Sequence, residues 1–95
     1  MTVGRIYRMI AKEEDADKLR EGLSAVGPFI TSQEGCLGVD VFNDQESPCC
    51  FLLIEKWESI EHHQAALAAM PDGIFDEVMS CLEEPPEASY AALIS

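Results

Sequence analysis

The sequence predicts an α+β fold of the split β-α-β, ferredoxin-like kind (βαββαβ), with one antiparallel sheet and its helices on one face. Three observations lead to this class. Short apolar runs alternate with stretches of helical periodicity, in the order strand, helix, strand, strand, helix, strand. A turn-rich segment, 43–48, joins the second and third strands as a hairpin. The 95 residues suffice for one domain, 1–95, with a single core.

The first strand and the first helix account for residues 3–32. Residues 3–11 carry apolar side chains on both faces, which a strand tolerates when both sides of its sheet are covered. Acidic residues at 13–15 favour a helix N-terminus, and apolar residues then recur at helical spacing as far as Ser32. Because Pro28 lies inside this stretch and has no amide hydrogen, we expect a kink or a helix in two pieces.

The rest of the chain follows from its apolar runs and breakers. Glu55 ends a run too continuous for a one-sided surface strand, and Ser59 is a good N-cap for the helix that follows. That helix is interrupted at 71–73, where proline and glycine stand close together. The expected elements after the first helix are strands 37–42 and 49–54, helices 60–70 and 74–82, and strand 88–94.

The helices can cover only one face of this sheet. In the third strand, however, Leu52 and Ile54 alternate with Phe51 and Leu53, so both faces are apolar. Something else must cover the second face, and a second copy of the same sheet is the simplest cover. We therefore expect a homodimer formed through the face opposite the helices.

The balance of charge excludes several classes of partner. The chain has 18 acidic and 6 basic residues, a net charge of −12, which repels phosphate backbones and anionic lipid. We expect neither nucleic acid nor a membrane as partner. No apolar run approaches the length of a membrane-spanning helix, and residues 1–5 lack the apolar core of a signal peptide. The expected location is cytoplasmic.

The four cysteines, at positions 36, 49, 50 and 81, have no spacing that matches a zinc motif. Cys49 and Cys50 are neighbours on a predicted strand and point to opposite faces, so they cannot pair there. We expect all four to be small, reduced hydrophobic residues. The sequence also contains no phosphate-binding glycine loop and no dinucleotide fingerprint, so we expect no metal and no cofactor.

The junction between the third strand and the next helix is the predicted site. Trp57 stands at this corner, either as the wall of a pocket or as packing between sheet and helix. At about 100° per residue, His63 falls on the apolar stripe that faces the sheet, whereas His62 turns to solvent. A histidine in such a position is either a satisfied core residue or, above a pocket, a general base.

Several motifs resemble one known family. The segment Glu34-Gly35-Cys36-Leu37, the hairpin ending in Ser47-Pro48 and the strand end Ile54-Glu55-Lys56-Trp57-Glu58-Ser59 resemble the antibiotic biosynthesis monooxygenase domain family. The helix with the histidines and a closing strand with Tyr90 are similar too. The resemblance implies a homodimeric α+β barrel with two sheets packed face to face and an apolar pocket between the sheet and the helices of each subunit.

The family includes cofactor-independent monooxygenases of polyketide quinones, quinol oxidases, haem-degrading enzymes and an isomerase. The resemblance therefore implies a cofactor-independent monooxygenase of a small aromatic molecule, a quinol or a polyketide phenol. The alternatives are a non-catalytic homodimer that binds small hydrophobic molecules and an isomerase or lyase of a small metabolite. Haem degradation is disfavoured because Tyr7 stands at the strand-one position of the haem branch's asparagine, and the last helix has no histidine.

The resemblance also suggests roles for individual residues. His63 is the candidate base and Trp57 the wall that stacks on the substrate, whereas Ala66 replaces a second histidine that many members carry. Arg5 and Arg8 lie on opposite faces of the first strand, so only one of them can reach the pocket and hold a phenolate there. The expected substrate-binding residues are Tyr7, Arg5, Arg8, Phe75 and Met79.

Overall fold

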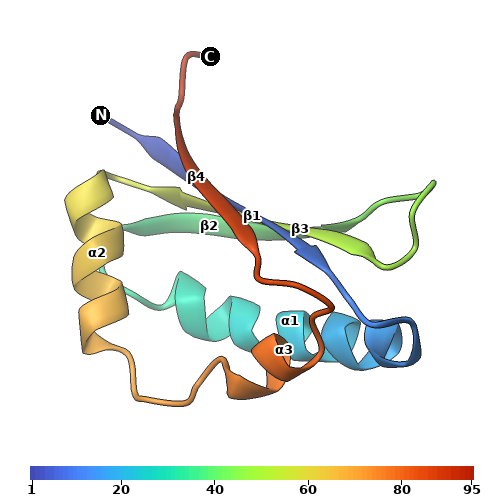
Figure 1. The fold of residues 1–95 in the computed structure, drawn as a ribbon. Helices are drawn as coiled ribbons and strands as arrows, with labels where there is room; N and C mark the ends of the chain where they lie inside the picture. Colours follow the sequence, from blue (N-terminus) through green and yellow to red (C-terminus); the bar gives the residue numbers. More distant parts are fainter.

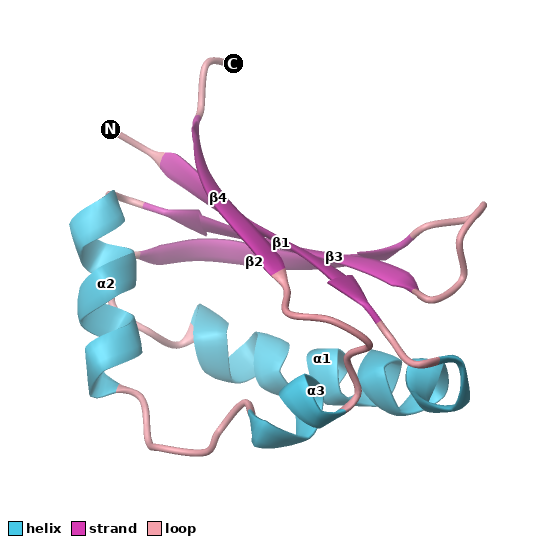
Figure 2. Ribbon diagram, in the orientation of Figure 1, coloured by secondary structure: helices cyan, strands magenta, loops and turns pink.

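A four-stranded antiparallel sheet forms one layer of the molecule, and the helices form the other (Figure 1; Figure 2). The computed structural model describes residues 1–95. Its sheet has the order β2-β3-β1-β4, so the predicted ferredoxin-like class is confirmed. The elements are β1 (Val3–Ile10), a 3-10 turn (Glu13–Asp15), α1 (Ala16–Thr31), β2 (Cys36–Asn43), β3 (Cys50–Trp57), α2 (Ile60–Ala69), α3 (Asp76–Ser80) and β4 (Glu87–Ala92).

Helix α1 is one continuous helix with Pro28 inside it, so of the two expected outcomes, a kink or a helix in two pieces, the second is excluded. The lost hydrogen bond is the one to the carbonyl of Ser24, an exposed residue, so water can satisfy that carbonyl. The Thr31 hydroxyl donates a hydrogen bond of 2.9 Å to the Gly27 carbonyl and supports the last turn. Proline is thus tolerated near the end of this helix.

Helix α2 begins where the N-cap predicts. The Ser59 hydroxyl oxygen accepts a hydrogen bond from the backbone N–H of His62 at 3.1 Å, which satisfies one of the free donors of the first turn. The helix ends at Ala69, just before Pro71. Helix α3 is shorter than the apolar pattern predicts, and β4 ends at Ala92, before the predicted end at residue 94. None of the helices has the length and apolar composition needed to span a lipid bilayer.

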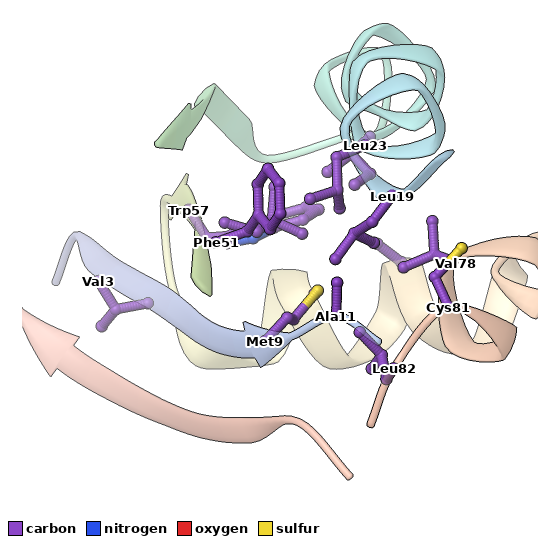
Figure 3. Packing of buried hydrophobic residues seen from close by; sticks show 13 residues of the cluster. Val3, Met9, Ala11, Leu19, Leu23, Phe51, Trp57, Val78, Cys81 and Leu82 are labelled. Atoms are coloured by element: carbon purple, nitrogen blue, oxygen red, sulfur yellow. The ribbon is translucent and has the colours of Figure 1, made fainter. Parts of the chain in front are cut away.

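The core lies between the helices and the sheet face formed by alternate residues of β1 and β3. Figure 3 shows Phe51 and Trp57 from β3 meeting Leu19 and Leu23 from α1, with Val78 arriving from α3. Each of these five side chains is at most 3% exposed. The core therefore fixes the relative positions of β1, β3 and the helices, which together surround the site described below.

The opposite face of the sheet carries no helix (Figure 2). The strand pairing places Ile6 beside Ile54 and Phe42 beside Leu52 on this face. Phe42 is 54% exposed, while the other three side chains are partly exposed. The apolar second face that the sequence predicts is therefore present, and its burial by a second copy stays a prediction.

Candidate functional site

The two histidines of α2 take different positions. His63 is 1% exposed and points into the space above β1 and β3. The sequence predicted that His62 turns to solvent, and this is wrong in part. The side chain is half-buried, and its Nδ1 lies 2.7 Å from the Ser59 hydroxyl. Its ring also occupies the space that a Cβ on Gly35 would need. Gly35 has φ of +85°, so glycine is required there for both backbone conformation and space.

Two tyrosine hydroxyls flank the His63 ring. The Tyr7 hydroxyl lies 3.1 Å from Nε2, and the Tyr90 hydroxyl lies 2.6 Å from Nδ1. A neutral imidazole has one N–H and one acceptor nitrogen, so one tyrosine accepts a hydrogen bond and the other donates one. Tyr7 belongs to the central strand β1 and Tyr90 to the edge strand β4, so the imidazole bridges two neighbouring strands.

Glu55 is a buried carboxylate beside this histidine. It is 4% exposed, and its Oε1 accepts a hydrogen bond of 2.9 Å from the indole N–H of Trp57 and lies 3.7 Å from Nε2 of His63. In the sequence, Glu55 stands at the end of an apolar run and within the strand-end motif, but it was not among the predicted site residues. The missed signal is the alternation of Leu53, Glu55 and Trp57, which places all three on the helix-facing side of β3.

Burial shifts the pKa of each of these groups toward its neutral form. Desolvation, and then the nearby Arg5 guanidinium, lower the pKa of His63 from 6.5 to about 4. Desolvation also raises the pKa of Glu55, although the Trp57 hydrogen bond and Arg5 act in the opposite direction. Burial likewise raises the pKa of Tyr7. An ionised Glu55 would favour the imidazolium, but both partners of that ion pair are disfavoured by their surroundings.

The two arginines of β1 are separated by the sheet. Arg8 is exposed on the face without helices, so it does not reach the site. Arg5 lies on the helix-facing side, with its guanidinium carbon 5.0 Å from the ring centre of Tyr7 and 4.3 Å from that of Tyr90. Its Nε is buried without a hydrogen-bond partner. Arg5 thus supplies positive charge next to His63, though it does not line the cavity described next.

A cavity of about 130 Å³ opens beside His63. Its polar end is formed by Tyr7, Glu55 and His63, and the remainder is apolar. Phe75 and Met79 line it. The fully buried Trp57 lies behind Glu55 and outside the wall, which is the packing position of the two that the sequence allowed. The other lining residues are Met9, Leu53, Leu67, Met70, Val78 and Pro86.

One family of known proteins matches most of this chain. Residues 2–70 match the model of the antibiotic biosynthesis monooxygenase family. The chain belongs to this family. The resemblance noted in the sequence is therefore confirmed. In a search of curated proteins, no match to the chain is found.

Solved structures share the fold over nearly the whole chain. A protein from Bordetella bronchiseptica, named for the antibiotic biosynthesis monooxygenases, is 20% identical with a TM-score of 0.87, covering 99% of this chain and 98% of its own. A Mycobacterium tuberculosis protein is 17% identical with a TM-score of 0.83, covering 100% and 97%. A Pseudomonas aeruginosa protein is 18% identical with a TM-score of 0.84, covering 99% and 95%. At these identities the likeness establishes the fold alone.

Proposed function

We propose that this chain is a cofactor-independent monooxygenase of a small, single-ring aromatic such as a quinol. The observation that carries the proposal is the apolar cavity with Tyr7, Glu55 and His63 together at one end. An aromatic ring fits the apolar part, and its hydroxyl group then meets the polar end. Membership in the monooxygenase family supports the reaction class.

The size of the cavity favours one ring over a polycyclic polyketide. Its volume is about 130 Å³, and an engineered apolar cavity of about 150 Å³ binds benzene. A fused system of three or four rings would have to displace Phe75 or Met79 from the wall. Of the two substrate types that the sequence suggests, the quinol is therefore the one we propose.

The proposed chemistry needs only the substrate and O2. Loss of a hydroxyl proton gives an electron-rich anion that can pass an electron directly to O2. One oxygen atom then enters the ring and the other leaves as water, so a para-quinol and O2 give a hydroxyquinone and water. The four electrons that O2 accepts all come from the substrate. The protein's contribution is a path for the proton, the shape of the cavity and the exclusion of water.

The roles that we propose for the side chains follow their positions. Tyr7 and His63 receive the substrate's hydroxyl group, while Phe75 and Met79 hold the ring. Trp57, which the sequence suggested as a stacking wall, acts through the hydrogen bond that positions Glu55. Arg5 disfavours the imidazolium form of His63 by its charge.

We also propose that the protein is a homodimer through the sheet face without helices. Partly exposed Ile6, Leu52 and Ile54 and the exposed Phe42 lie together on that face. An apolar patch rarely stays in contact with water on a monomeric protein of such high net charge. A second copy of the sheet would cover it.

Oxygen uptake with a panel of quinols tests the proposed function. We expect uptake with single-ring para-quinols, little with fused-ring quinols, and one labelled oxygen atom in the product when the gas is ¹⁸O2. Binding without uptake would favour a non-catalytic binding protein. Product formation without uptake would favour an isomerase or lyase. Hydrogen peroxide in place of labelled product would indicate a simple oxidase.

A further inference from the structure

Tyr90 is in contact with the proposed catalytic centre but not with the cavity. Its hydroxyl lies 2.6 Å from Nδ1 of His63, whereas it is absent from the cavity wall that Tyr7 and His63 share. Tyr90 is partly exposed and belongs to β4, an edge strand of the sheet. The three side chains therefore form a continuous row from the cavity, through His63, to a partly exposed residue of the edge strand.

We propose that Tyr7, His63 and Tyr90 form a proton relay that connects the substrate's hydroxyl group with solvent, and that Tyr90 is its outer end. This proposal rests on the proposed function. The distances of 3.1 Å and 2.6 Å are those of hydrogen bonds, so each transfer occurs between groups already in contact.

Protons are conserved in each step of the relay. The substrate's hydroxyl gives its proton to the oxygen of Tyr7, which gives its own proton to Nε2 of His63. His63 gives its Nδ1 proton to Tyr90, and Tyr90 gives its proton to water. The substrate is left as an anion, water carries one extra proton, and each relay residue has as many protons as before. Only the tautomer of His63 has changed.

The overall reaction restores the relay. Conversion of a quinol and O2 to a hydroxyquinone and water releases no net proton. The proton that leaves along the relay must therefore return when the second oxygen atom departs as water. A return through Tyr90 and Nδ1 restores the starting tautomer of His63, so the enzyme is ready for the next turnover.

A relay suits this histidine better than service as a terminal base. A terminal base must hold the proton as an imidazolium, and burial together with Arg5 makes that form costly. Glu55, the remaining ionisable group near the ring, is itself pushed toward its neutral form by burial. In the relay, His63 accepts at one nitrogen while it donates at the other, so no buried charge has to accumulate on the ring.

The variant Tyr90→Phe separates the relay from a merely structural role. It keeps the ring that stacks on Arg5 and removes only the hydroxyl that meets His63. We expect kcat for oxygen uptake to fall by roughly tenfold to a hundredfold, with ligand affinity within about twofold of wild type. We also expect kcat of the variant, unlike that of wild type, to rise with the concentration of a small buffer such as imidazole, which replaces the outer proton carrier. The control is Ser89→Ala, the preceding residue of β4, whose side chain points to the opposite face.

A measurement on the unchanged protein keeps the test independent of the variant's folding. In mixtures of H2O and D2O, several protons in transfer make the dependence of kcat on deuterium fraction curved, and this is the expected result. A linear dependence, or an unchanged kcat in Tyr90→Phe without buffer rescue, overturns the relay alone. Absence of oxygen uptake by wild type with every quinol overturns the proposed function and the relay with it.

Discussion

The indole N–H of Trp57 donates a hydrogen bond of 2.9 Å to Oε1 of Glu55, and both side chains are buried on the helix-facing side of β3. They are two positions apart on one strand, so alternation brings them to the same face. The tryptophan thus satisfies a carboxylate that lines the cavity. Trp57 also packs edge-to-face against His63, with the two ring centres 5.4 Å apart, so it contacts two residues of the cavity's polar end without lining the cavity itself.

Replacement of Trp57 by phenylalanine tests this relationship. The variant Trp57→Phe retains most of the apolar contact but leaves the Glu55 oxygen without its donor. We expect the free energy of unfolding to fall by about 1–3 kcal/mol at pH 7, as measured by urea denaturation. In the background Glu55→Gln, whose neutral amide depends less on a donor, the same tryptophan change should cost less. Equal costs in the two backgrounds would show that the hydrogen bond contributes nothing.

Replacement of each histidine tests the assignment of the site. His63→Gln keeps a polar side chain of similar reach but cannot exchange protons, so we expect turnover to fall on the order of a hundredfold while ligand binding persists. His62→Gln removes the contact with the Ser59 hydroxyl but nothing in the cavity, so turnover should stay unchanged. Oxygen uptake and calorimetric binding measure the two effects. Wild-type rates in both variants would make His63 a core residue only.

The stability of the protein should depend on pH through His63. Its pKa falls from 6.5 to about 4 on folding, so the unfolded chain binds a proton in this window that the folded chain does not. The free energy of unfolding therefore decreases as pH falls from 6.5 to 4. Below pH 4, His63 causes no further decrease, because both states then bind the proton. The full effect corresponds to on the order of 3 kcal/mol. Glu55 has the opposite effect. Because its pKa is raised in the folded state, its protonation increases the free energy of unfolding as pH falls toward 4.5.

The contribution of His63 is isolated by comparing two variants. Between pH 4 and 7, the unfolding free energy of His63→Gln should decrease less steeply with falling pH than that of wild type. His62→Gln serves as the matched control, because it removes the neighbouring histidine of the same helix. Parallel curves for His63→Gln and wild type would contradict the lowered pKa.

Much of the site was predictable because it lies on regular elements. Helical spacing placed His63 over the sheet, and strand alternation separated Arg5 from Arg8. Glu55 was missed because a charged residue at the end of an apolar run is usually solvated, although its alternation with Leu53 and Trp57 already assigned it to the buried face of the strand. The pairing of two strands that are distant in the sequence cannot be predicted from the local pattern of either strand.

Tyr90 illustrates the same limit. The sequence places it on a closing strand, but its contact with His63 depends on β4 pairing with β1, an association across most of the chain. The last turns of α1 show a second limit of sequence patterns. The effect of Pro28 on the helix depends on whether water reaches the Ser24 carbonyl. Long-range pairing and local solvation are properties of the folded chain, so periodicity alone does not predict them.

The apolar sheet face should govern association. In a dimer formed through this face, Leu52→Lys would bury an unpaired charge among Ile6, Ile54 and Phe42, at a cost of several kcal/mol. In a monomer the same lysine would reach water, because Leu52 is only partly buried in the isolated chain. We therefore expect wild type to be a dimer at micromolar concentration by light scattering and Leu52→Lys to be a monomer or to unfold. Glu21→Lys, a charge change on the exposed surface of α1, should leave the dimer intact. A monomeric wild type would refute the interface, because the apolar face would then be exposed in the native state.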